Sequence, residues 1–120
     1  MLMQMYKHLN LSYLESLIGD DAETMAVIFS TLLEEVPEEI AKMERLINKQ
    51  DWHSLHEVSH KFKSTLAYIG NDEIFDANQS VMMNARNLEK LDEIPALLEI
   101  VKNSWRFIQP EVEAALEDIG

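Results

Sequence analysis

The sequence predicts an all-α protein, an up-and-down antiparallel four-helix bundle with a short extra helix at the N-terminus. Apolar residues recur at three- and four-residue spacing through most of the chain, which is the period of an amphipathic helix. No stretch has the strict alternation of a half-buried strand. Three glycines and three prolines in 120 residues leave few places where long helices could stop. We therefore expect residues 1–120 to form a single domain.

The net charge and composition of the chain argue against several classes of function. Ten basic against 22 acidic residues give a formal net charge of −12, which argues against binding to nucleic acid or to an anionic membrane surface. The chain has no cysteine, so a disulfide framework and cysteine-based zinc sites are excluded. The N-terminal residues contain no sustained apolar run, so neither a signal peptide nor a membrane span is predicted. A cytoplasmic protein is the expectation.

The first predicted helix covers residues 9–18 and ends at Gly19. Asp20 or Asp21 then provides a carboxylate to cap the second helix. Acidic residues follow in the first turn of that helix, where its dipole favours negative charge.

The second helix extends to about Asn48, because its apolar stripe continues that far. Pro37 lies within it and removes one backbone hydrogen bond, so a kink or a break is expected near Glu34. One kinked helix is favoured, because no residue near Val36 would make a good new cap. The acidic run over residues 34–39 is interpreted as a solvated face.

The third helix lies within residues 51–70, with Asp51 as its N-cap and Gly70 as a left-handed stop. At 100° per residue, five apolar side chains fall on one narrow stripe that should face the core. These are Leu55, Val58, Phe62, Leu66 and Ile69. His60 lies about 150° from the centre of this stripe. Its imidazole is therefore predicted to point into solvent.

The fourth and fifth helices follow after short connections. Asp72 is expected to cap a helix over about residues 73–88, which would bury Ile74, Ala77, Val81, Ala85 and Leu88. The turn before it is so short that the third and fourth helices must be antiparallel neighbours. The last helix begins after residues 91–93, with Pro95 in its first turn. Pro110 is expected to kink or end it.

The surroundings of His60 are unusual for so acidic a chain. No carboxylate occurs from Val58 to Asn71, whereas Lys63 lies one turn beyond His60. Ser64 and Ala67 follow on the same face and are small. A neutral imidazole is a competent nucleophile near pH 7. An ammonium group beside it could neutralise a bulky anion attached to its nitrogen.

These residues resemble the signature of the histidine phosphotransfer (HPt) family, which is His, any residue, an apolar residue, Lys and a small residue, with a glycine ending the helix. His60, Phe62, Lys63, Ser64 and Gly70 stand at these positions. Ser64 departs mildly from the glycine that is commoner there. The resemblance covers roughly residues 9–116.

The resemblance implies a phosphorelay intermediate in two-component signalling. His60 would accept a phosphoryl group, on Nε2, from a receiver-domain aspartate and pass it to another receiver aspartate, with Lys63, Ser64 and Ala67 beside the phosphoryl group. The implied partners are receiver domains of response regulators or of a hybrid histidine kinase, and these bring the Mg²⁺. The chain has no Gly-rich nucleotide loop, so we expect a monomeric phosphoryl carrier without cofactor and without catalysis of its own.

One flank of the fourth helix is predicted to lie beside the phosphoryl site. Reflecting His60 through a turn centred near Asn71 places it opposite Met82. The same flank carries Phe75, Gln79 and Arg86. These four residues, together with His56 on the third helix, are the candidate docking surface or phosphoryl contacts.

Two alternatives remain open. Residues 56–60 match the H-E-x-x-H pattern of zinc metalloproteases. No histidine follows His60, however, so the third ligand would have to be a carboxylate such as Glu73 or Glu89, and Lys63 beside a zinc ion is unfavourable. No metal is therefore expected. The other alternative is a helical protein-interaction module without phosphoryl chemistry, whose histidines are ordinary surface residues.

Overall fold

The computed structural model describes residues 6–119, and this part of the chain is helical without strands. The predicted all-α fold is confirmed. The elements in chain order are α1 (Ser12–Ile18), α2 (Ala22–Asn48), α3 (Trp52–Ala67), α4 (Asp72–Asn87), the 3₁₀ turn η1 (Leu91–Glu93) and α5 (Ile94–Ile119). No helix in this part of the chain is long and apolar enough to cross a membrane.

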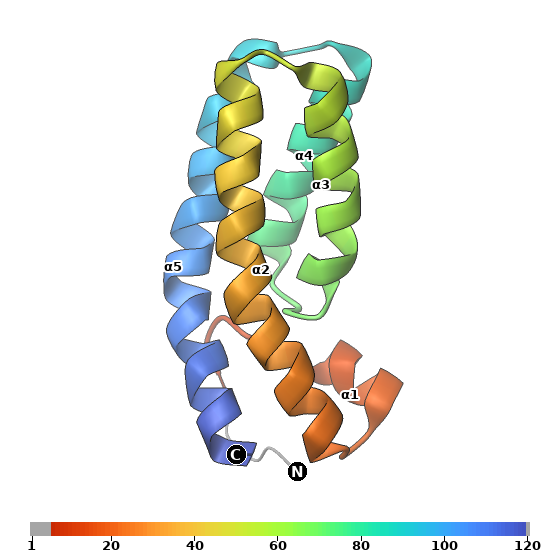
Figure 1. Cartoon of the computed structure of the whole chain (residues 1–120), viewed down its shortest axis with the longest axis vertical. Helices are drawn as coiled ribbons and strands as arrows, with labels where there is room; N and C mark the ends of the chain where they lie inside the picture. Colours follow the sequence, from red (N-terminus) through yellow and green to blue (C-terminus); the bar gives the residue numbers. More distant parts are fainter. Residues whose placement is uncertain (1–5, 120) are drawn as a thin grey trace.

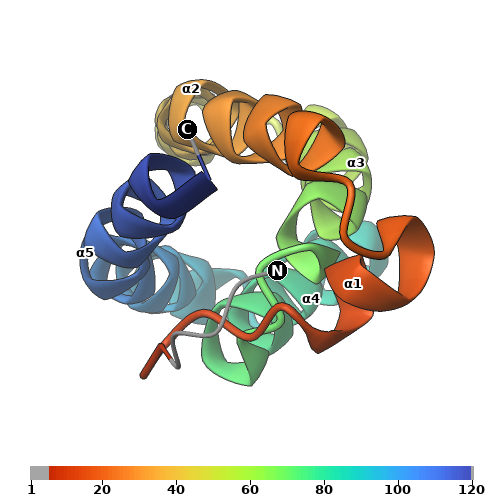
Figure 2. The ribbon, with the colours of Figure 1, turned by 90° about the horizontal axis from the view of Figure 1, so that it is seen from below.

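Helices α2 to α5 form an up-and-down bundle (Figure 1). Seen from below, along the length of the bundle, they follow one another around a ring, and α5 closes it against α2 (Figure 2). Helix α1 lies outside this ring, at the end of the bundle where α3 turns into α4. The predicted short extra helix is therefore present.

The core lies between the four long helices and holds apolar side chains from all of them. On α3, Leu55, Phe62 and Leu66 are fully buried, as is Ile69 just beyond the helix. Val58 is only partly buried, at the edge of the predicted stripe. Burying each of the larger side chains stabilises the fold by about 1.5–3 kcal/mol. This stripe fixes which face of α3 looks outward.

Both interior prolines are accommodated within continuous helices. Helix α2 runs through Pro37, so the single helix favoured by the sequence is confirmed, and its lower half changes direction in Figure 1. Helix α5 runs through Pro110 to Ile119, so of the two outcomes expected there, an end is wrong. A proline removes only one backbone hydrogen bond. The burial of Val112 and Ala115 beyond Pro110 keeps α5 on the core.

The first helix begins three residues later than predicted, at Ser12 rather than Leu9. Leu9 and Leu11 are buried nevertheless, but they belong to a non-helical segment over residues 6–11, the N-terminal segment. Asn10 within it accepts from the backbone of Ser12 at 2.9 Å. Apolar spacing alone could not distinguish this buried segment from a helical turn.

Contacts from distant parts of the chain hold the N-terminal segment in place. One carboxylate oxygen of Glu111, on α5, accepts from the backbone N–H groups of His8 and Leu9 at 2.8 and 2.9 Å. The backbone N–H of Asn10 donates to the carbonyl of Ile69 at 2.9 Å. These bonds, made to neighbours far away in sequence, replace the helical hydrogen bonds that Leu9 to Leu11 were expected to make.

The N-caps of α2 and α3 are residues that the sequence predicts as caps, whereas the N-cap of α4 is a different residue. Asp21 and Asp51 are N-caps. Donation by the hydroxyl and backbone N–H of Ser54 holds the pKa of Asp51 below its usual range. Asn71, not Asp72, caps α4, because its side-chain oxygen accepts from the N–H of Ile74 at 3.0 Å.

Two further ends depend on left-handed backbone conformations. Gly70 has a φ of 68°, as predicted for a stop, although the last regular residue of α3 is Ala67. Leu88, expected in the core, ends α4 with a φ of 54° and is 65% exposed. The left-handed turn takes its side chain out of the helical register that predicted burial.

Candidate functional site

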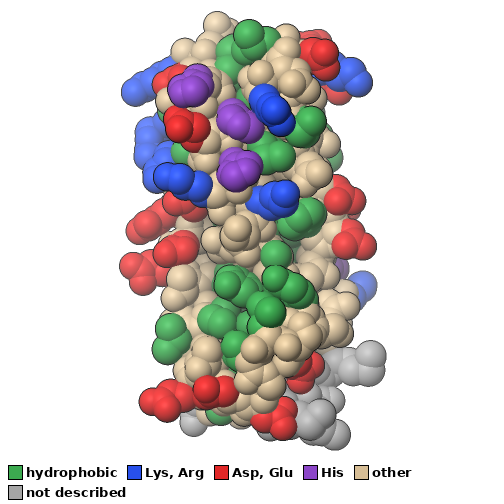
Figure 3. All heavy atoms as spheres, turned by 90° about the vertical axis from the view of Figure 1, so that its right-hand side faces the viewer, with side chains coloured by type: hydrophobic (Ala, Val, Ile, Leu, Met, Phe, Trp, Pro, Cys, Tyr) green, Lys and Arg blue, Asp and Glu red, His purple; other side chains and the backbone are tan. Residues whose placement is uncertain are grey.

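His60 lies on the outward face of α3 and is exposed, as the apolar stripe of this helix predicts. Figure 3 shows histidine side chains in a row along this face of the molecule, with Lys or Arg side chains beside them and an acidic side chain next to the upper end of the row. Carboxylates lie mainly towards the edges of this view. Basic side chains therefore lie beside the histidines in a chain with a net charge of −12.

The residues that follow His60 on α3 leave space above it. Ser64 is exposed, and Lys63 and Ala67 are partly buried. All three lie within two turns of His60 on a helix that continues unbroken to Ala67. The structure thus gives His60 one cationic neighbour and two small ones, in the order that the sequence predicts.

A buried polar contact fixes the backbone just before His60. The side-chain N–H of Asn78, on α4, donates to the carbonyl of Ser59 at 2.9 Å. Both side chains are buried, and the Ser59 hydroxyl donates to the carbonyl of Leu55 at 2.8 Å. A directional bond in the core sets both the register and the rotation of α3 against α4. Asn78 was not among the residues predicted from the sequence. The signal was a polar residue beside the buried Ala77, opposite a small serine.

His56 forms the second polar contact between these helices. Its Nδ1 lies 3.2 Å from the carbonyl oxygen of Met82. Its ring lies 6.0 Å from that of His60, measured between centroids, with 47° between the ring planes. His56 is partly buried, whereas His60 is exposed. His56 therefore lies beside His60, and its role as a docking or phosphoryl contact stays a prediction.

The predicted position of Met82 is wrong by about one turn. Met82 lies opposite His56 instead of His60, and only 7% of it is exposed, so it offers little surface for docking. The residue that faces the turn of His60 is Asn78. The reason is the connection: α3 ends at Ala67 and α4 starts at Asp72, so the turn is centred before Asn71.

The other candidates on α4 are placed differently from one another. Gln79 and Arg86 are exposed. Phe75 is partly buried and lines a shallow cavity of about 220 Å³ together with Tyr13, Ala67 and Gly70. Tyr13 comes from α1, is 49% exposed and stacks on Tyr68 with 6.4 Å between ring centroids. No local pattern pointed to Tyr13, because α1 reaches this place only through the tertiary fold.

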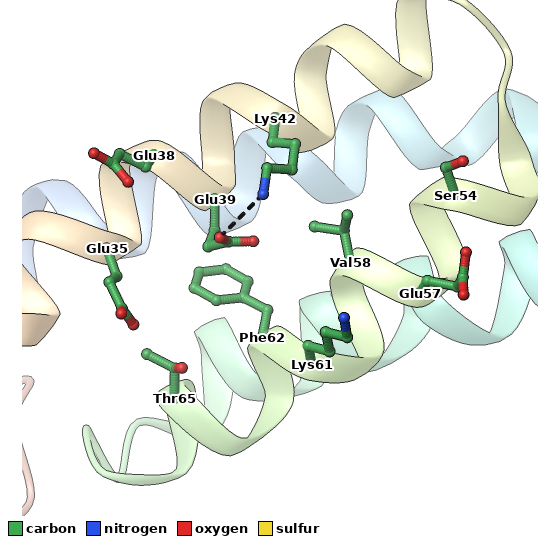
Figure 4. A pocket seen from close by; sticks show the side chains of 10 residues that line it. All are labelled: Glu35, Glu38, Glu39, Lys42, Ser54, Glu57, Val58, Lys61, Phe62 and Thr65. Carbon is green, nitrogen blue, oxygen red and sulfur yellow. Dashed lines mark ion pairs between the residues drawn. The ribbon is translucent and has the colours of Figure 1, made fainter.

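A second cavity, of about 420 Å³, lies between α2 and α3 on the other side of the histidine helix (Figure 4). Its lining combines carboxylates, among them Glu35 and Glu39, with Lys42 and Lys61. Glu39 and Lys42 form an ion pair at 3.6 Å. Lys61 therefore belongs to this groove, and Lys63 is the lysine on the side of His60.

The zinc alternative finds no complete ligand set among the described residues. Glu57, the catalytic glutamate of an H-E-x-x-H site, lies 3.5 Å from Nε2 of His53, an interaction that is ionic only when His53 is protonated. Between residues 6 and 119, no group of three or more His, Cys, Asp or Glu side chains is placed to hold a metal ion. His56 and His60 thus have no third ligand in this part of the chain.

Comparison with protein families identifies the chain. The family model described as the Hpt domain matches residues 27–119, which include all of α3, α4 and α5. The chain belongs to the histidine phosphotransfer family. Hpt domains are phosphocarrier modules of phosphorelay signalling, and they interact with receiver domains. No curated protein and no solved structure matched this Hpt chain in the corresponding comparisons.

Proposed function

We propose that His60 of this Hpt domain accepts a phosphoryl group from a receiver-domain aspartate and passes it to the aspartate of a second receiver. The observation that carries the proposal is the exposure of His60 on a face where Lys63 supplies a cation and Ser64 and Ala67 leave room. A phosphoryl group on a receiver can approach such a nitrogen without rearrangement of the bundle.

The transfer needs little from this chain beyond the nucleophile. The lone pair of Nε2 on His60 attacks phosphorus, the N–P bond forms and the P–O bond to the aspartate breaks. The electron pair of that bond returns to the carboxylate of the receiver. Lys63 then faces the phosphoryl dianion as a point charge. The Mg²⁺ that neutralises charge during the transfer comes with the receiver, and no carboxylate occurs from Val58 to Asn71 of this chain.

The cavity lined by Tyr13, Ala67 and Phe75 is the proposed docking surface for the receiver. It adjoins the phosphoryl site, since Ala67 lies two turns from His60 on the same helix. Aromatic side chains are enriched in the buried cores of protein interfaces. Docking here would bring the receiver aspartate over the small residues and towards the imidazole.

Gln79 and Arg86 receive different roles. Gln79 follows Asn78, which contacts the turn of His60, and its exposed amide is suited to donate to a phosphoryl oxygen. Arg86 lies eight residues beyond Asn78 on α4, about 12 Å further along the helix. That distance is too long for a phosphoryl contact. We therefore propose that Arg86 contacts the partner protein instead.

The direct test mixes the protein with a ³²P-labelled phosphorylated receiver and Mg²⁺ and measures acid-labile label on the Hpt chain. The parent and a His53→Gln control should both become labelled, because His53 is exposed and lies two turns away from His60. His60→Gln should stay unlabelled. Label on His60→Gln at the parental level would refute the assignment, and receiver binding that continues without any transfer by the parent would favour the interaction-module alternative.

A further inference from the structure

We infer that His56 is a positioning residue for the phosphotransfer: it accepts a hydrogen bond from Nδ1–H of His60 and so leaves Nε2 of His60 as the unprotonated nucleophile. The inference rests on the proposed role of His60 and extends it to the ring beside it. Three features of the structure carry it: the partner of His56 on α4, the spacing of the two rings, and the buried contact that fixes the turn between them.

The first feature fixes the tautomer of His56. A backbone carbonyl oxygen only accepts hydrogen bonds. The contact between Nδ1 of His56 and the carbonyl of Met82, at 3.2 Å, therefore requires the proton of neutral His56 to be on Nδ1. Which ring nitrogen carries the proton is set by the hydrogen bond that the other one makes. Nε2 of His56 is thus left as an acceptor.

The second feature places this acceptor beside His60. The residues are one helical turn apart, and side chains on a helix lean towards its N-terminus, so the ring of His60 leans towards His56. The centroids are 6.0 Å apart, whereas an N–H···N bond of about 3 Å brings two imidazole centroids to roughly 5 Å. Among the described residues no hydrogen bond yet joins the rings. A small side-chain rotation closes the gap, and such bonds often tighten only in the reacting complex.

The third feature explains why His56 can direct His60 and not the reverse. His56 is partly buried and tied to α4, whereas His60 is exposed. The bond between Asn78 and Ser59 holds the backbone between the two histidines. His56 is therefore the fixed member of the pair, and His60 is the ring that adjusts to it.

The chemistry of the transfer explains why a hydrogen bond between His60 and His56 matters. Neutral imidazole has one N–H and one lone pair. If the proton of His60 is on Nε2, the outer nitrogen cannot attack phosphorus. With the proton on Nδ1 and donated to His56, the lone pair of Nε2 forms the N–P bond. The phosphorylated ring of His60 then carries a positive charge, which its hydrogen bond to Nε2 of His56 stabilises. The proton stays on Nδ1, so the step needs no other acceptor.

The experiment compares His56→Phe, which keeps an aromatic ring but has no acceptor, with His56→Gln, which keeps an amide that can donate to Met82 and accept from His60. The matched control is His53→Phe, an exposed ring on the same helix. At metal sites, loss of the hydrogen-bond partner that fixes the tautomer of a histidine typically costs about tenfold or more. We expect phosphoryl acceptance by His60 to slow about tenfold in His56→Phe, to recover largely in His56→Gln and to stay unchanged in His53→Phe.

The spectroscopic readout is the nitrogen-15 spectrum of the imidazole rings at a pH where both are neutral. In the parent, both His56 and His60 should carry their protons on Nδ1, and in His56→Phe His60 should lose this preference. A parent in which His60 carries its proton on Nε2 would overturn the inference, whatever the variants do. Unchanged transfer in His56→Phe, with label still on His60, would also overturn it while leaving the proposed function intact.

Discussion

Replacing Lys63 with alanine removes the ammonium group one turn from His60, and the structure allows the cost to be worked out. Side chains three residues apart on a helix lie about 5 Å apart at closest. A unit charge and a phosphoryl dianion at that distance attract by about 1.7 kcal/mol in water. Physiological salt halves this to about 0.9 kcal/mol. Lys63→Ala should therefore lower the equilibrium constant for transfer onto His60 about fourfold.

The assay measures how ³²P label divides between receiver and Hpt chain at equilibrium. The matched control is Lys61→Ala, which removes the same charge from the same helix but from a side chain that points into the groove between α2 and α3 (Figure 4). Its effect should stay below about twofold. In about 1 M salt the screening length falls to about 3 Å, so the difference between the two variants should nearly vanish.

Two results would refute this reasoning. Equal losses in Lys61→Ala and Lys63→Ala would show that the overall charge matters, not the position of Lys63 beside His60. A fourfold loss in Lys63→Ala that persists in about 1 M salt would show that Lys63 acts through packing or a desolvated contact instead of a screened charge.

Three further predictions concern stability, measured by urea unfolding. Gly70→Ala should lower the free energy of unfolding by at least about 2 kcal/mol, because a Cβ at this left-handed position is strained and would overlap the backbone carbonyl oxygen of Asn10. Asn78→Asp should cost about 3 kcal/mol at neutral pH by turning a buried carboxylate towards the carbonyl of Ser59, and should recover as the pH falls and the acid protonates. Burial and donation to Asp118 raise the pKa of Tyr6 to about 12. Since the unfolded pKa is about 10, stability should fall between these values in the parent and less steeply in Tyr6→Phe.

Each of these predictions has an outcome that contradicts it. A stable Gly70→Ala protein would mean that the N-terminal segment yields easily. Stability of Asn78→Asp that does not change with pH would mean that position 78 reaches water. If the stability of the parent and of Tyr6→Phe changed in parallel above about pH 10, the hydroxyl of Tyr6 would not donate to Asp118 in solution.

The sequence was sufficient for the fold and for the direction of His60, because both depend on helical periodicity. The apolar stripe that buries Phe62 and Leu66 also points position 60 outward, and no tertiary information enters that deduction. The caps at Asp21 and Asp51 were readable for the same reason. They involve residues within three positions of one another.

The errors arose where one helix meets another. Placing Met82 opposite His60 required the centre of the turn, and a shift of that centre by one or two residues moves the facing residue by a full helical turn. Leu88 followed the apolar period but stands where the helix ends in a left-handed residue. Tyr13 and Asn78 acquire their roles only from neighbours brought by the fold. Local pattern carries no information about such neighbours.

The two hydrogen bonds that the Glu111 carboxylate accepts from the N-terminal segment have a consequence for the order in which the protein folds. Its partners His8 and Leu9 precede it by 103 and 102 residues. During synthesis these two backbone groups leave the ribosome well before Glu111 does, so they cannot be bound until α5 has been made. The hairpin of α3 and α4, by contrast, closes through a short loop and can form early. The α3–α4 face that bears His60 can therefore form before the N-terminal segment packs against α5.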